Sequence, residues 1–314
     1  MRLEQLRAVV EIVKHGYNVS RAAEALDAPQ PAVSRQLREL ERELGVDIFL
    51  RARQRLRGLT GPGVQIVEVA RRILADTRTL AEIARDFQAE ESGTLTIATT
   101  HTQALYALPP IVRAFAARHP GVEVMIRQGS PQEIVELVRT GGADVCIGSE
   151  SPRDAGGVAL FPCYAMQRIV IAPRDHPLTR SRSVTLETLA RYPIITYDSP
   201  FIGRSKLVRT FAALGLKPKI VLSAADTDVI KAYVEQGLGI AIVASLAFDP
   251  ARDRQLRAID ASHLFEPNTI YLGVRRNDYL RNFVFDFIQM FAPNVKRERI
   301  DRAIRGGDKA ASAR

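Results

Sequence analysis

The chain has 314 residues, 46% of them hydrophobic, so it is long enough for two or three domains with sizeable cores. No apolar run approaches the roughly 20 residues that span a bilayer, and the N-terminus lacks the layout of a secretory signal, so we expect a cytoplasmic protein. The formal net charge of +9 suits a polyanionic partner without proving one. Cys146 and Cys163 lie outside any CxxC or Cys/His cluster, so we expect no disulfide framework, no metal site and no cofactor.

The first 60 residues contain three helical segments and a short basic region. Apolar residues recur at helical spacing in each segment, namely Leu3, Leu6, Val10 and Val13, then Ala22, Ala23 and Leu26, then Val33, Leu37, Leu40 and Leu44. Gly16, Pro29 and Gly45 mark the ends, and Pro31 suits the first turn of the third helix. Residues 47–50 predict a short strand, after which alternate residues are basic, namely Arg51, Arg53, Arg55 and Arg57.

The stretch from Ser20 to Leu44 has the spacing of a helix-turn-helix. Its second helix exposes polar side chains that can bond base edges and phosphates in the major groove. The alternating arginines resemble a wing lying along a phosphate backbone. A helical bundle with a solvated charged face is the alternative, and the order of the elements argues against it. The expected DNA-binding residues are Ser20, Gln30, Pro31, Ser34, Arg35, Arg38, Arg51, Arg53 and Arg55.

A long amphipathic helix follows the break at residues 60–63. From Val64 to about Ala89 the sequence holds neither proline nor glycine, and one apolar stripe runs through it. A second copy of the same helix is the simplest partner for this stripe. We therefore expect a winged helix-turn-helix over residues 1–59 and a dimerising linker helix over residues 60–92.

Short β-rich runs alternate with helical patterns after Ser92, which indicates parallel βαβ units. The pattern restarts near Arg168 and closes with a strand at 270–274 and a helix at 279–291. We expect an α/β effector domain over residues 93–300, with a ligand cleft between its lobes. Lobe one comprises residues 93–163 and 268–295, lobe two comprises residues 164–267, and a basic tail spans residues 301–314.

The N-terminal strings resemble those of the LysR-type regulators. They are Ala22-Ala23-Glu24-Ala25-Leu26, Gln30-Pro31-Ala32-Val33-Ser34-Arg35-Gln36-Leu37 and Leu40-Glu41-Arg42-Glu43-Leu44-Gly45-Val46-Asp47-Ile48-Phe49. The resemblance extends to about residue 295. It implies an effector domain like the type 2 periplasmic binding proteins, promoter DNA and RNA polymerase as partners, and a homodimer that usually pairs into a homotetramer.

Three polar segments follow strands of the expected first lobe. Thr99 to Gln103, Gln128 to Pro131 and Ser149-Glu150 each lie at a strand end, where hydroxyls, amides and free backbone N–H groups suit an anion. Any one of them could be a simple helix cap, but three at one edge indicate a binding cleft.

The same segments resemble the CysB-like subfamily, which controls the cysteine regulon. Further shared strings are Phe161-Pro162-Cys163-Tyr164, Asp175-His176-Pro177-Leu178, Gly203-Arg204-Ser205 and Asp226-Thr227-Asp228-Val229-Ile230-Lys231. The resemblance implies an activator of sulfur assimilation that binds an acetylated serine, with sulfate or thiosulfate as competitor. The effector residues it implies are Thr100, Thr102, Gln103, Gln128, Ser149, Glu150, Tyr164, Met166, Ile202 and Thr227.

Two positions depart from the subfamily pattern. Ile202 stands where relatives have threonine, and Met166 stands where they have tryptophan. We therefore predict weaker sulfate binding or a different sulfur metabolite, and a regulator of sulfonate use that senses adenylyl sulfate stays a second hypothesis. A two-lobed solute-binding protein or enzyme is a third, but the absence of a GxSxG segment and of a leader opposes it. His101 is expected to orient the ligand or to play a structural role.

Overall fold

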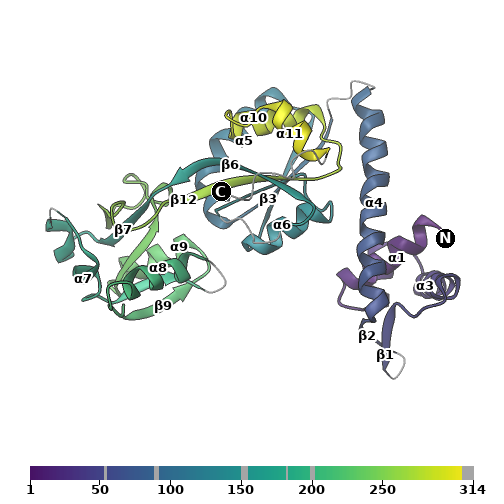
Figure 1. Cartoon of the computed structure of the whole chain (residues 1–314), viewed down its shortest axis with the longest axis horizontal. Coiled ribbons are helices and arrows are strands. Elements are labelled where there is room, and N and C mark those ends of the chain that lie inside the picture. Colours follow the sequence, from purple (N-terminus) through teal and green to yellow (C-terminus); the bar gives the residue numbers. More distant parts are fainter. Residues whose placement is uncertain (53–54, 88–91, 150–154, 182, 199–201, 306–314) are drawn as a thin grey trace. The chain divides into compact units, whose positions relative to one another are not determined.

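The computed structural model describes residues 1–52, 55–87, 92–149, 155–181, 183–198 and 202–305 (Figure 1). They belong to two compact units, Met1–Glu90 and Glu91–Arg314, each of which is described here by itself. Among these residues no helix has the length and apolar character needed to cross a membrane.

The first unit is a winged helix-turn-helix followed by a long helix. Its elements are α1 (Leu3–Lys14), α2 (Val19–Ala25), α3 (Gln30–Leu44), β1 (Phe49–Ala52), β2 (Arg55–Leu59) and α4 (Gly61–Phe87). The Asn18 side chain caps α2 by accepting from the backbone N–H groups of Ser20 and Arg21. Gly45 ends α3 in the left-handed region, with φ 70°. Strands β1 and β2 pair antiparallel as the wing.

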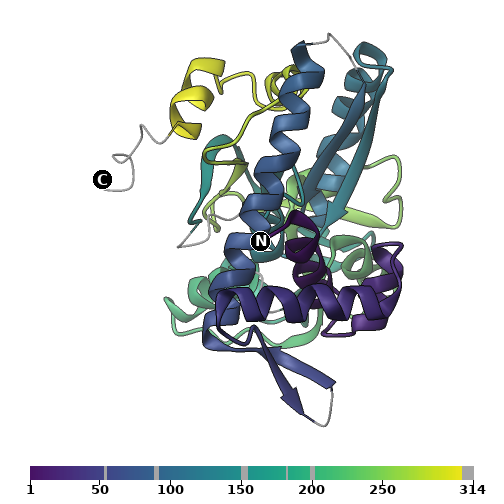
Figure 2. The same ribbon diagram turned by 90° about the vertical axis from the view of Figure 1, so that its right-hand side faces the viewer.

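Helix α4 shares a core with the helices that precede it. Val67 and Ala70 are buried in the same apolar cluster as Val9 and Leu40, and Figure 2 shows α1 beside the N-terminal half of α4. The first turns of α4 therefore belong to the packing of the DNA-binding unit. The expected boundary between residues 59 and 60 therefore falls within one shared core, because the helix-turn-helix buries apolar side chains against α4.

The buried carboxylate of Glu41 on α3 binds the start of the wing. Glu41 is 7% exposed, its Oε1 accepts from the backbone N–H groups of Ile48 (2.9 Å) and Phe49 (3.4 Å), and its other oxygen binds the Arg51 guanidinium. Replacing Glu41 by alanine orphans two backbone donors, so we expect the free energy of unfolding of this unit to fall by about 2–3 kcal/mol. Chemical denaturation followed by circular dichroism measures the change.

The matched control for this prediction is Glu43→Ala on the same helix. Glu43 is 48% exposed and pairs with the N-terminal amine, so its loss should change stability by less than about 1 kcal/mol. Equal losses from both variants would show that the Glu41 contacts do not hold the wing.

The second unit consists of two α/β lobes, each built on a five-stranded sheet. The first sheet has the order β4 (Val122–Gln128), β3 (Gly93–Thr99), β5 (Val145–Gly148), β12 (Asn268–Arg275), β6 (Val158–Met166). The second has the order β11 (Leu256–Asp260), β7 (Arg168–Pro173), β10 (Ile240–Ala244), β8 (Ile194–Tyr197), β9 (Ile220–Ala224). Strand β3 pairs parallel with β4 and β5, and β8 pairs parallel with β9 and β10, as the βαβ pattern predicted.

Helices cover both sheets. They are α5 (Leu108–Arg118), α6 (Pro131–Arg139), α10 (Asn282–Phe291) and α11 (Arg297–Ile304) in lobe one, and α7 (Leu186–Leu189), α8 (Ile202–Ala212) and α9 (Thr227–Glu235) in lobe two. The core of lobe one is rich in aromatic rings because α10 packs Phe287 on Phe115 of α5. The chain crosses between the lobes twice, after β6 and before β12 (Figure 1).

Two boundaries expected from sequence shift in the structure. Strand β6 pairs with β12 as far as Met166, so lobe two begins near residue 168 rather than 164. The expected tail from residue 301 is wrong in its first residues, because Ala303 and Ile304 are buried with Ile300 in the core of lobe one. The amphipathic spacing of its apolar residues, rather than its charge, determines that the start of this segment is a buried helix.

Candidate functional site

The N-terminal part of α3 carries the exposed polar face expected to read DNA. Gln30 Nε2 donates to Ser34 Oγ at 3.0 Å, so these two side chains form one polar edge. The Arg35 side chain is 71% exposed, and its Nε lies 3.9 Å from Glu39. Arg38 is exposed one turn after Ser34, and Pro31 occupies the first turn. Residues four apart share a helix face, so one surface presents hydroxyl, amide and guanidinium groups.

The remaining DNA-binding predictions fall on α2 and the wing. Ser20 is exposed on α2, and Arg55 is exposed on β2. Arg51 differs, because its guanidinium is bound to the buried Glu41 and therefore also holds the wing in place. Arg53 lies outside the described residues.

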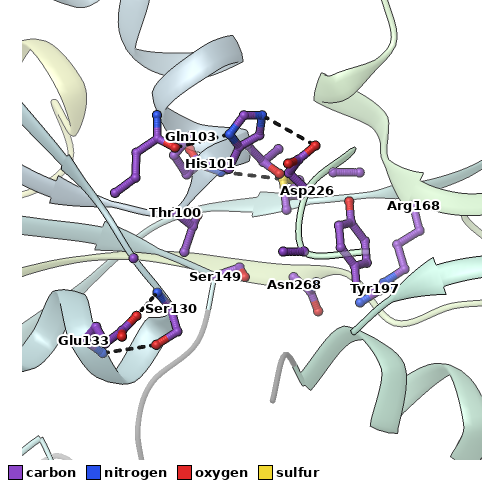
Figure 3. Close-up of a pocket in the computed structure, with 16 residues that line it drawn as sticks. Thr100, His101, Gln103, Ser130, Glu133, Ser149, Arg168, Tyr197, Asp226 and Asn268 are labelled. Carbon is purple, nitrogen blue, oxygen red and sulfur yellow. Dashed lines mark hydrogen bonds and ion pairs between the residues drawn. The ribbon is translucent and has the colours of Figure 1, made fainter. Parts of the chain in front are cut away.

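A cavity of about 440 Å³ lies between the two lobes of the second unit. The three polar strand ends predicted from sequence meet there: Thr100 after β3, Gln128 at the end of β4 and Ser149 after β5. Figure 3 shows Thr100 and Ser149 among the lining residues. They meet because the carboxyl ends of parallel strands lie at one edge of a sheet. Thr102, Gln103 and Met166 also line the cavity, as expected.

Gln103 is held in place behind this edge. It is 1% exposed, its Oε1 accepts from the Tyr164 hydroxyl at 2.7 Å, and its Nε2 lies 3.8 Å from Met166 Sδ. Burial raises the pKa of Tyr164 to about 12, so this hydroxyl stays protonated and donates. Tyr164 thus supports the cavity through Gln103 rather than lining it.

Three further effector predictions have different outcomes. Thr227 does not line the cavity but is completely buried beside it, with its hydroxyl 2.7 Å from Tyr197 Oη and 3.4 Å from Thr102 Oγ1. Glu150 lies outside the described residues, and so does the side chain of Ile202, although Ile202 begins α8.

Lobe two contributes lining residues that the sequence reasoning missed. They are Arg168, Tyr197, Ala225, Asp226 and Ala244, and Asn268 joins them from β12. Arg168 is 5% exposed and lies beside Tyr197 at the side of the cavity opposite Glu133 (Figure 3). It is the one permanently charged cation among the described lining residues. An arginine opening the otherwise apolar strand β7 is the signal that could have revealed it.

His101 faces lobe two across the cavity. Its Nε2 lies 3.0 Å from Asp228 Oδ2 and 4.0 Å from Asp226 Oδ1, and its Nδ1 lies 3.2 Å from Gln128 Oε1. One His and two Asp ligand atoms this close could hold a divalent cation. Asp228, however, already accepts from the Tyr106 hydroxyl, and the Lys231 ammonium lies 3.6 Å away, so protein groups occupy the cluster.

A helix-turn-helix unit joined to a two-lobed unit with a polar cleft defines a ligand-responsive DNA-binding regulator. Residues 3–63 match the family described as "Bacterial regulatory helix-turn-helix protein, lysR family", and residues 88–296 match "LysR substrate binding domain". The chain belongs to the LysR family of transcriptional regulators.

Relatives of nearly equal length are transcriptional regulators. The chain is 44% identical over 305 residues to "HTH-type transcriptional regulator SsuR" of Burkholderia cenocepacia, covering 97% of this chain and 99% of that one. It is also 44% identical over 306 residues to "HTH-type transcriptional regulator CysB" of the same organism, covering 98% of each. The crystal structure of the cofactor-binding domain of the Cbl transcriptional regulator has a TM-score of 0.65 at 42% identity, covering 68% of this chain and 94% of that one.

Proposed function

We propose that this regulator controls genes of sulfur assimilation and cysteine biosynthesis in response to a small anionic sulfur metabolite bound in the interlobe cavity. The observation that carries the effector proposal is the convergence of three polar strand ends on one cavity that also holds Arg168. Hydroxyls, amides and a guanidinium in one cleft complement an oxyanion or carboxylate. Similarity to SsuR, CysB and Cbl supports the choice of target genes.

In this proposal Thr100, Thr102, Gln103 and Ser149 bind the anionic end of the effector, and Arg168 supplies the opposite charge from lobe two. Small-molecule sites range from about 300 to 1,000 Å³, so a cavity of about 440 Å³ has room for more than a lone sulfate ion. An acetylated serine is the first candidate, with sulfate or thiosulfate as competitor. Adenylyl sulfate is the second, favoured by the same volume and by the methionine at position 166.

Self-association through α4 supports DNA binding as a homodimer, and a homotetramer is the expected assembly. Val69 and Leu80 expose 42% and 68% of their surface and, being about three turns apart, lie on one face of this helix. Apolar side chains on such a face are buried when two copies pair. Paired reading helices then meet successive half-sites, and contact with RNA polymerase is part of the same proposal.

Regulation rather than catalysis is the proposed role of the cavity. His101, its one imidazole among the described lining residues, faces Asp226, Asp228 and Gln128 rather than a hydroxyl nucleophile. Effector binding is expected to shift the equilibrium between lobe arrangements and thereby alter the DNA bend.

Titration calorimetry with O-acetylserine, N-acetylserine, sulfate and adenylyl sulfate tests the effector, and a gel shift on DNA upstream of the gene for this chain tests the target. We expect at least one of the four compounds to bind and to change the mobility of the complex. Absence of binding by all four at millimolar concentration would contradict the sulfur proposal while leaving family membership untouched.

A further inference from the structure

Helix α9 of lobe two begins against the segment of lobe one that carries the proposed effector ligands. The Tyr106 hydroxyl donates to Asp228 Oδ1 at 2.7 Å, and His101 Nε2 lies 3.0 Å from Asp228 Oδ2. Thr102 Oγ1 lies 3.4 Å from Thr227 Oγ1 one residue earlier in α9. Three side chains of one short segment thus contact the first turn of one helix, and we call these contacts the clasp.

Lobe two holds its half of the clasp firmly. Lys231, one turn further along α9, is 7% exposed and donates to Asp253 at 2.9 Å and to the Ala247 carbonyl at 3.0 Å. Its ammonium also lies 5.0 Å from the centre of the Tyr106 ring, a favourable cation–π geometry. The Asp226 side chain caps the helix by accepting from Val229 N at 2.8 Å. Helix α9 is therefore anchored at several points.

The clasp has the charge state that makes its hydrogen bonds strong. Burial opposes ionisation of Asp228, but hydrogen bonds from Tyr106 and His101 and the charge of Lys231 outweigh it, so the Asp228 pKa lies below its ordinary value. Burial raises the pKa of Tyr106 to about 12, with Asp228 contributing, so its hydroxyl is protonated. A protonated phenol donating to a carboxylate is a charge-assisted bond.

The clasp and the proposed effector ligands share one short segment of the chain. Residues 100–103 line the cavity, and His101, Thr102 and Tyr106 contact α9 from the same seven residues. Residues Gln103–Ala107 form a π-helix (η1), a rare conformation that is frequent at functional sites. A shift of this segment when an anion binds must therefore move α9 or break the clasp.

We infer that Tyr106 and Asp228 are positioning residues of the effector site, which hold the ligand-bearing segment of lobe one on helix α9 and so pass effector binding to lobe two. This inference rests on the proposed function, because it concerns the same cavity. Without the clasp a smaller fraction of molecules has the lobes arranged for binding, and apparent affinity falls by that fraction.

The test uses the full chain with Tyr106→Phe and Asp228→Asn, neither of which lines the cavity. Tyr233→Phe, exposed on the same helix, and Asp175→Asn, exposed elsewhere in lobe two, are the matched controls. Calorimetry with O-acetylserine, sulfate and adenylyl sulfate gives effector affinity, and DNase I footprinting with and without the bound compound gives the response. Hydrogen exchange of residues 227–235 reports directly on α9.

We expect the clasp variants to bind effector about threefold to tenfold more weakly. Their footprint without effector should match that of the parent chain, whereas the effector-induced change in the footprint should be reduced. Exchange in the first turn of α9 should be faster than in the controls even without effector. A purely structural role would lower thermal stability and basal DNA binding together and would leave the footprint response intact.

Clasp variants that keep the parental affinity, footprint response and exchange rates would overturn the inference. If the parent chain binds none of the probes, the proposed effector class fails instead. The exchange rates then decide the clasp, because unchanged protection of α9 in Tyr106→Phe would show that this contact holds nothing.

Discussion

Replacing Arg35 by alanine is expected to weaken binding to the promoter by about tenfold or more, and replacing Ser34 and Arg35 together should abolish sequence-specific binding. Arg35 lies near the start of α3 with 71% of its side chain exposed, where a reading helix contacts base edges. A bidentate arginine contact to a base discriminates by about 1–3 kcal/mol, and the Ser34 hydroxyl beside it bonds Gln30 on the same face. Competition gel shifts with specific and scrambled DNA measure the loss.

Arg42→Ala is the control for this prediction. Arg42 lies in the last turn of the same helix, so its loss should reduce binding to both DNAs alike and leave their ratio unchanged. Effector affinity should stay at the parental value in the Ser34 and Arg35 variants. If it falls with DNA binding, the variants are misfolded, and if the specificity ratio survives, this face of α3 does not read the bases.

Replacing Thr100 by valine is expected to weaken effector binding by about tenfold or more. Valine keeps the shape of threonine but removes a hydroxyl at the point where β3 ends in the cavity. A hydrogen bond to a charged group contributes about 1.5–3 kcal/mol, and a buried anion left without this partner loses most of that. Calorimetry with the compound that binds the parent chain best measures the effect.

The matched control is Thr94→Val, at an exposed position of the same strand. It should bind the effector as the parent chain does, and gel shifts should show that both variants keep basal DNA affinity. Undiminished binding by Thr100→Val would contradict the placement of the anionic end at the strand ends, and Arg168→Gln would then be the next variant to measure.

Much of the DNA-binding unit follows from local spacing. Helix α3 is predictable because Pro31 lies in its first turn, Gly45 ends it and one apolar stripe lies between them. Each of these signals acts within a few residues. The role of Arg51 is not predictable in this way. Its position in a row of arginines indicates a phosphate contact, but its guanidinium also binds Glu41, which lies ten residues earlier and is buried.

The strings that resemble the LysR-type regulators could also be recognised from sequence, and they imply DNA binding and effector sensing. The matches to both LysR domains confirm the family. The boundaries were less accurate. Charge alone suggested a tail from residue 301, whereas the helical spacing of Ile300, Ala303 and Ile304 buries α11 on lobe one.

The sequence by itself determined that helices α2 and α3 expose polar side chains and that polar residues end β3, β4 and β5. Both follow from short-range periodicity and from the rule that parallel strands end at one edge. Only the tertiary structure placed Arg168 opposite that edge and Asp228 against Tyr106, which is 122 residues away in the chain. The two crossings between lobes bring these residues together, and a contact over such a distance depends on the packing of whole sheets, which no local pattern encodes.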